Sequence, residues 1–135
     1  MSRDFKAELV KLRLQQAAET IADAQSLLET GRTTRSIINR AYYAMFYAVL
    51  ALLQATGKIA SKHTGIISLF DSEFVRPGTF PKELSQALHE AFDQRQEFDY
   101  KPVSNATREE AIALVARAQG FVESVTIYLD RSLPR

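Results

Sequence analysis

Arginine and tyrosine recur in this sequence at spacings that place them on one face of a helix. Arg40, Tyr43 and Tyr47 stand at i, i+3 and i+7 in the segment NRAYYAMFYAVLALL, and seven residues turn through about 700 degrees, nearly two complete turns. A guanidinium that enters an apolar region needs a carboxylate, carbonyl groups or an anion, because burying it unpaired costs several kcal/mol. Two interpretations stay open. Arg40 pairs with an acid on a neighbouring helix while the tyrosines pack, or it binds a phosphate or the carboxylate of a partner.

A second group of polar residues occurs in the segment RQEFDYKP. Arg95 and Asp99 stand at i and i+4, so they could form an ordinary intrahelical ion pair. In the alternative, Arg95 and Tyr100 face solvent beside Arg40 and belong to one site. The candidate ligand-binding residues are therefore Arg40, Tyr43, Tyr47, Arg95, Asp99 and Tyr100.

The two histidines do not indicate a metal site. His63, in SKHTG, suits a capping or packing role at the start of a helix, and His89, in the middle of a helix, suits a solvated or packed role. Neither has an evident acidic partner, as a metal site would need. Gly-rich phosphate loops and nucleophile elbows are also missing from the sequence. We expect no metal and no cofactor.

Apolar residues recur at steps of three and four along five segments, which predicts an all-α, up-and-down helical bundle. The expected helices run from about Asp4 to Glu29, from a cap at Thr33 or Thr34 to about Thr56, from about Thr64 to Val75, from Pro81 to the DYKPVSN loop, and from a capping box of Thr107 and Glu110. Gly31 and Gly57 follow the first two helices as natural stops.

Length and composition indicate one domain, residues 1–135, with a substantial hydrophobic core. The chain has 46% hydrophobic residues, a formal net charge of +1 and no cysteine, which disfavours disorder and excludes disulfides and thiolate metal sites. The charged N-terminal segment does not resemble a signal peptide, so we expect a cytoplasmic protein. Thirteen consecutive apolar residues from Ala41 to Leu53 span roughly 20 Å as a helix, less than the roughly 30 Å of a bilayer core. We therefore expect a buried helix and no membrane partner.

Positive charge is concentrated in one part of the chain. Between Thr30 and Phe70 there is no acidic residue, whereas Arg32, Arg35, Arg40, Lys58 and Lys62 are basic. Such a group would favour an anionic ligand if its members converged. Arg32 and Lys58 lie at opposite ends of the second helix, on the order of 30 Å apart. A solvated surface is therefore as consistent with the pattern as an RNA-binding one.

Three segments, INRAYYAMFYAVLALLQATG, SKHTGIISLF and RQEFDYKP, resemble the HEPN domain (higher eukaryotes and prokaryotes nucleotide-binding) in their order along a helical chain. The resemblance covers nearly the whole sequence. It implies a helical bundle, usually dimeric and often encoded beside a small nucleotidyltransferase in a toxin–antitoxin-like pair. Many members are metal-independent endoribonucleases in which an arginine is followed, after four to six residues, by a histidine. There the histidine moves a proton while the arginine stabilises the phosphate.

This sequence departs from that motif at the histidine. Counting from Arg95, one position for the histidine is occupied by Tyr100, and counting from Arg40, the last position is occupied by Tyr47. A phenol with a pKa near 10 keeps its proton at neutral pH, whereas imidazole titrates near 6.5. Tyrosine can therefore hold a phosphate oxygen but is a poor general base. The catalytic candidates are Arg95, Tyr100 and His63. A contact between His63 and either guanidinium, across one cleft open to water, would favour scission.

Three functions follow as expectations. The first is a HEPN-domain protein that binds RNA, a nucleotide or a cognate nucleotidyltransferase through the arginine–tyrosine face. The second is a metal-independent endoribonuclease toxin with an atypical acid–base residue. The third is a non-catalytic interaction scaffold in which Arg40 is fully paired inside the fold.

The resemblance, together with the excess of apolar positions on the second and fifth helices, also predicts a homodimer. A monomeric mass in light scattering at micromolar concentration would contradict it.

Overall fold

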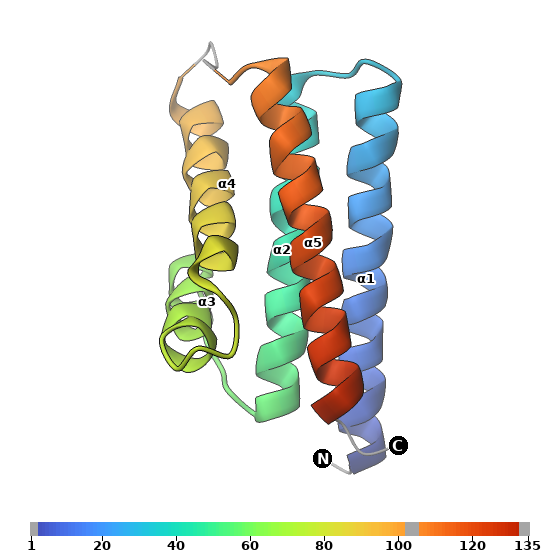
Figure 1. Cartoon of the computed structure of the whole chain (residues 1–135), viewed down its shortest axis with the longest axis vertical. Coiled ribbons are helices and arrows are strands. Elements are labelled where there is room, and N and C mark those ends of the chain that lie inside the picture. Colours follow the sequence, from blue (N-terminus) through green and yellow to red (C-terminus); the bar gives the residue numbers. More distant parts are fainter. Residues whose placement is uncertain (1–2, 102–105, 133–135) are drawn as a thin grey trace.

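All regular structure in the described part of the chain is helical. The computed structural model describes residues 3–101 and 106–132, without the side chains of residues 3, 4 and 99. The helices are α1 (Arg3–Glu29), α2 (Thr34–Thr56), α3 (His63–Phe70), the π-helical turn η1 (Asp71–Val75), α4 (Lys82–Tyr100) and α5 (Arg108–Ser132) (Figure 1). The predicted all-α bundle is confirmed.

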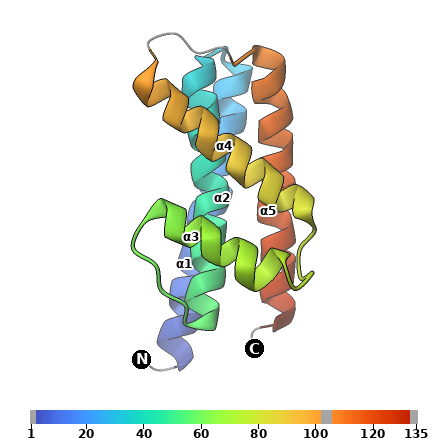
Figure 2. The same ribbon diagram turned by 90° about the vertical axis from the view of Figure 1, so that its left-hand side faces the viewer.

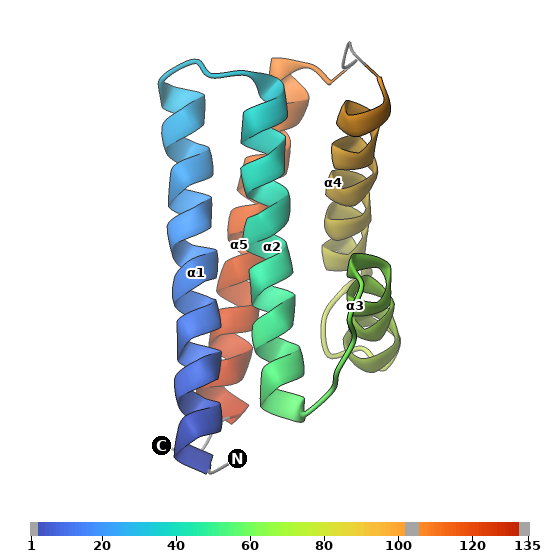
Figure 3. The same ribbon diagram turned by 180° about the vertical axis from the view of Figure 1, so that it is seen from behind.

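Three long helices form the body of the bundle, and the two shorter ones cover one side of it. Helix α2 is antiparallel to α1 and packs against α5, as Figures 1 and 3 show from opposite sides. Helices α3 and α4 cross this layer obliquely (Figure 2). Helix α4 thereby returns the chain to the end of the bundle where α2 begins. The side chains that α2 presents to α3 and α4 thus face two other segments of the chain.

The predicted helix boundaries rest on local hydrogen bonds, and most are confirmed. The Thr33 hydroxyl accepts a hydrogen bond from the amide of Ser36 at 3.2 Å, and Gly57 closes α2 in a left-handed conformation with φ of 73°. The Thr107 hydroxyl accepts from the amide of Glu110 at 3.1 Å. Pro81 differs from the prediction, because it lies at the cap in an extended conformation and α4 begins at Lys82.

The predicted third helix, from Thr64 to Val75, is interrupted. Helix α3 ends at Phe70 and the chain continues in a π-helical turn, closed by a hydrogen bond of 2.8 Å from the amide of Arg76 to the carbonyl of Asp71. Both Phe70 and Phe74 remain buried across this change. A wider turn does not alter the three-to-four spacing of the apolar residues, so periodicity could not reveal it.

Helix α2 is the centre of the core. Twelve of its residues are buried, including Ile38, Tyr42 and Leu52, each 0% exposed. By length and composition the whole of α2 and α5 could cross a membrane, with 67% and 39% of the most apolar window buried inside the fold. The argument from the thirteen-residue run therefore does not exclude a membrane by length. For α2, burial inside the fold is what supports a core helix.

Phe70 connects α3 to the rest of the core. Its ring lies 5.2 Å from that of Phe121 on α5 and 5.9 Å from that of Phe80, centroid to centroid, and it is fully buried. We expect Phe70→Ala to lower the free energy of unfolding by about 3–5 kcal/mol, because the cavity cannot collapse completely. Equilibrium denaturation in urea measures the change. The control Ile59→Ala, at a side chain that is 91% exposed, should change it by less than about 0.5 kcal/mol; equal effects would contradict the assignment.

Candidate functional site

The predicted arginine–tyrosine face of α2 exists. The guanidinium carbon of Arg40 lies 5.3 Å from the ring centre of Tyr43, and the rings of Tyr43 and Tyr47 are 5.9 Å apart. All three side chains are partly exposed. Arg40 also donates a hydrogen bond of 3.0 Å to the side-chain oxygen of Asn39. Helical spacing is sufficient to produce this arrangement, since the residues belong to successive turns of one helix.

Arg95 reaches the same face from α4. Its guanidinium carbon lies 5.1 Å from the ring centre of Tyr43 and 5.4 Å from that of Tyr42. Two guanidiniums, those of Arg40 and Arg95, therefore contact one tyrosine ring. Arg95 thus reaches the ring that Arg40 contacts, and the assignment of both arginines to one binding site stays a prediction.

His63 is positioned there by α3. The imidazole stacks on Phe46 with ring centres 4.2 Å apart, and lies 5.9 Å from the ring of Tyr42 and 6.0 Å from that of Tyr43. His63 and Arg95 thus contact the same two tyrosines. We call the residues that meet here the Tyr43 cluster: Arg40, Tyr42, Tyr43, Phe46, Tyr47, His63 and Arg95.

The hydroxyl of Tyr42 is hydrogen-bonded to His63. It lies 2.8 Å from Nδ1 of the imidazole. Burial raises the pKa of Tyr42 far above its usual value, and the opposing charge of Arg95 does not cancel this effect. The protonated phenol can donate to Nδ1, which leaves the proton of the neutral ring on Nε2, or accept from Nδ1–H, which leaves Nε2 with a free lone pair. Partial burial lowers the pKa of His63, and the charge of Arg95 lowers it further, so the ring is neutral at pH 7.

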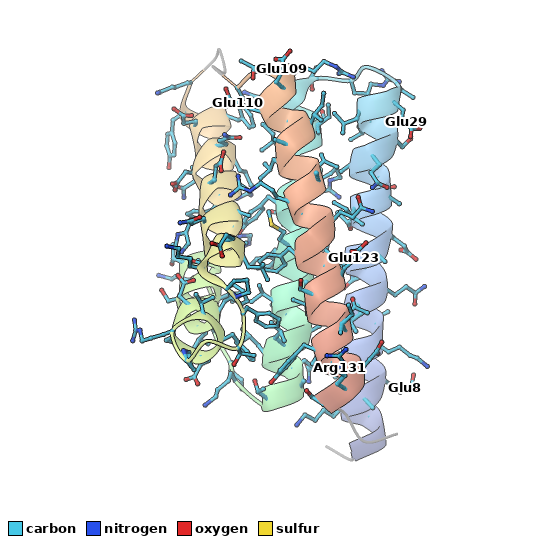
Figure 4. The ribbon with its side chains drawn as sticks, viewed as in Figure 1. Glu8, Glu29, Glu109, Glu110, Glu123 and Arg131 are labelled. Atoms are coloured by element: carbon cyan, nitrogen blue, oxygen red, sulfur yellow. The ribbon has the colours of Figure 1, made fainter. Side chains whose placement is uncertain are left out.

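No carboxylate of the described side chains neutralises the two guanidiniums. The ion pairs found in this part of the protein lie elsewhere: Lys58 with Glu73, His89 with Asp71, Lys101 with Glu97 and Arg117 with Glu90. The carboxylates labelled in Figure 4 come from α1 and α5, whereas α2 and α3 carry none. Among the described side chains, none on a neighbouring helix forms the ion pair with Arg40 that the first alternative requires. The cluster is thus a group of hydrogen-bond donors with net positive charge.

Some predicted site residues are not brought into the cluster. Tyr100 is 85% exposed, and five residues of helix turn it about 140 degrees away from the face that carries Arg95. The side chain of Asp99 lies outside the described residues, so its predicted pairing with Arg95 is not addressed. His89 lies apart, with Nε2 2.6 Å from Oδ2 of Asp71. The other oxygen of that carboxylate, Oδ1, accepts a hydrogen bond from the Ser85 hydroxyl at 2.7 Å.

Sequence reasoning missed two members of the cluster, Tyr42 and Phe46. Both are buried, and both contact His63. One signal was available, because a tyrosine hydroxyl on an otherwise apolar helix needs a hydrogen-bond partner when it is buried. Nothing in the sequence identified His63, twenty-one positions later, as that partner.

Comparisons with known proteins agree on one family. The HEPN domain model matches residues 10–128. The chain is 35% identical over 120 residues to a protein named "UPF0332 protein" from Thermotoga maritima, covering 89% of this chain and 90% of that protein. It is 32% identical over 129 residues to "Putative toxin MJ0142" from Methanocaldococcus jannaschii, covering 96% of this chain and 86% of that one. A second protein of that organism, "Putative toxin MJ0605", is 29% identical over 93% of this chain and 91% of its own length.

The lowered pKa of His63 makes a prediction about stability. The unfolded chain takes up a proton at this residue near pH 6.5, before the folded protein does. The contribution of neutral His63 is therefore complete above about pH 6.5, declines as the pH falls toward the folded-state pKa, and is constant below it. We expect His63→Gln to show a smaller decrease in the free energy of unfolding between pH 7 and pH 5 than the wild type, measured by urea denaturation. Equal decreases would contradict the burial of a neutral imidazole.

Proposed function

This chain belongs to the HEPN domain family, and from that premise we propose that it is a toxin-like member which binds RNA or a nucleotide through the Tyr43 cluster without cutting it. The observation that carries the proposal is the meeting of Arg40 and Arg95 on the ring of Tyr43, with no acid of the described side chains beside them.

Two guanidiniums that contact one tyrosine ring favour the binding of an anion. Like charges repel, and each guanidinium–ring contact contributes only about 0.5–1 kcal/mol at a partly exposed site. A phosphate that reached both Arg40 and Arg95 would accept charge-assisted hydrogen bonds from the two guanidiniums and reduce the repulsion. A bound phosphate would supply a negative charge that none of the described side chains brings to the two guanidiniums.

The tyrosines favour a nucleotide over a free phosphate. Partly exposed rings such as Tyr43 and Tyr47 offer faces on which a base can stack, an interaction worth about 1–3 kcal/mol per base. A phosphate beside aromatic rings is the combination that proteins use for single-stranded nucleic acid.

The protonation of His63 supports binding without cleavage. Cleavage at a ribose 2′-hydroxyl needs a group that accepts its proton. We propose that the Tyr42 hydroxyl donates to Nδ1 of His63, 2.8 Å away, so that Nε2 carries the proton and the neutral ring offers a donor and no base. Tyr100, at the motif position, is a phenol. Both groups can hold a phosphate oxygen, and neither is suited to remove a proton at neutral pH.

The toxin-like role draws on the names of the two archaeal relatives. Pairing with a minimal nucleotidyltransferase, and assembly as a homodimer, are proposals that rest on the family resemblance. A nucleotidyltransferase gene beside this one would support the pairing, and failure of the two proteins to co-purify after joint expression would contradict it.

The binding proposal predicts different effects for two arginines. Arg95→Gln should weaken binding of single-stranded RNA about tenfold or more, because a charge-assisted hydrogen bond of roughly 1.5–3 kcal/mol is lost. The slope of log K against log salt should fall by about 0.7. Arg32→Gln removes the same charge at an exposed position outside the cluster and should change affinity less than about threefold. Fluorescence anisotropy measures both variants, and equal effects would contradict the site.

A second candidate function is metal-independent RNA scission, and one observation favours it. His63 and Arg95 contact the same two tyrosines, which brings the only imidazole of the cluster next to a guanidinium. If the Tyr42 hydroxyl instead accepted a hydrogen bond from Nδ1–H, Nε2 would carry a free lone pair and could act as a base.

An RNA cleavage assay in EDTA separates the two functions. The leading proposal predicts intact RNA with the wild-type protein. Scission that His63→Gln abolishes and that His89→Gln retains would replace it with the nuclease, since His89 is the matched histidine outside the cluster. Scission that survives both changes would remove His63 as the base.

A further inference from the structure

Beside the Tyr43 cluster lies a pocket of about 420 Å³, lined by Leu27, Arg35, Ser36, Asn39 and Arg40. Arg40 belongs to both, since its guanidinium contacts the ring of Tyr43 and its side chain forms part of the pocket wall. The pocket and the cluster are therefore neighbouring parts of one surface along α2.

Helix α4 fixes the position of Arg35, a residue of α2 that lines the pocket. Nη2 of Arg35 donates a hydrogen bond of 2.7 Å to the carbonyl of Phe98, and its guanidinium carbon lies 5.4 Å from the centre of the Phe98 ring. Phe98 stands three residues after Arg95 on α4, so one helix positions both arginines. The contact with Phe98 uses one of the five N–H donors of Arg35. A ligand would thus meet an arginine that is already oriented.

The lining has the chemistry of a nucleotide subsite. Arg35 and Arg40 supply positive charge, Ser36 and Asn39 supply neutral hydrogen-bonding groups, and Leu27 of α1 supplies an apolar surface. None of these lining residues is acidic. Cationic and amide groups beside an apolar wall suit a phosphate joined to a ribose or a base.

The distance along α2 indicates the length of the ligand. From Ser36 to Tyr43 the helix rises about 10 Å. A stacked single strand advances about 3.4 Å per nucleotide, so a strand that reaches from the cluster into the pocket covers about three nucleotides.

We propose that the pocket of Arg35, Ser36 and Asn39 is a second subsite, occupied by a neighbouring nucleotide of the strand whose phosphate is held at the Tyr43 cluster. The ligand is then an oligonucleotide of about three residues or more. This inference rests on the proposed function, because it extends the binding site at Arg40 and Arg95.

The test measures affinity for uridylates of one to four nucleotides at fixed low salt, with gels to verify that the RNA stays intact. In the wild type the affinity should rise at least tenfold from one to three nucleotides and change little thereafter. Ser36→Leu should abolish this gain while leaving the affinity for the mononucleotide within about threefold, because a larger neutral side chain fills the pocket without adding a charge beside Arg40. Ser36 is exposed in the first turn of α2, and leucine favours a helix more than serine does, so the variant is expected to fold.

Two comparisons make the outcome decisive. Thr34→Leu places the same side chain in the same helical turn but outside the pocket lining, and should retain the gain with length. Equal losses in Thr34→Leu and Ser36→Leu, or a wild type that binds one and four nucleotides equally well, would overturn the second subsite. The proposed function fails separately, if Arg95→Gln leaves the affinity for the mononucleotide unchanged.

Discussion

Helix α2 is enclosed by the other helices over most of its length, and any polar group that it carries into the core needs a partner there. The hydroxyl of Tyr42 is the group concerned, because this residue is fully buried and bonds to Nδ1 of His63. An unsatisfied hydroxyl would cost about 1–3 kcal/mol, so the bond ties the start of α3 to the middle of α2. The stacking of His63 on Phe46 also fastens the start of α3 to α2. The position of the imidazole, and with it the shape of the cluster, depends on this requirement.

Arg95 differs from the buried Tyr42 hydroxyl, because its charged group lies at the edge of the core. Its described partners are aromatic rings. The faces of Tyr42 and Tyr43 accept the cation without removing its charge. Burial lowers the pKa of His63 and the charge of Arg95 lowers it further, whereas burial raises the pKa of Tyr42 and the same charge opposes that rise. Burial and Arg95 thus act together on this surface, which carries no acid among the described side chains. Such a surface is suited to hold an anion more than to exchange a proton.

Much of the fold was predictable because its signals are local. The cap at Thr33, the left-handed Gly57 and the capping residue Thr107 act over three or four positions, and apolar periodicity marks each helix. The shared face of Arg40, Tyr43 and Tyr47 was predictable for the same reason. Local signals failed at the π-helical turn after Phe70, where a change in backbone width leaves the apolar spacing intact.

By its own pattern the sequence determined the helices, the absence of acids from Thr30 to Phe70 and the arginine–tyrosine face of α2. Only the tertiary structure decided that Tyr42 would bond to His63 and that Arg95 would cover Tyr43, while Tyr100 would not join them. The physical reason is separation along the chain. Positions within one helix are related by its fixed turn and rise. The contacts between α2, α3 and α4 depend on how their side chains pack, and the spacing of residues along the sequence does not specify that packing.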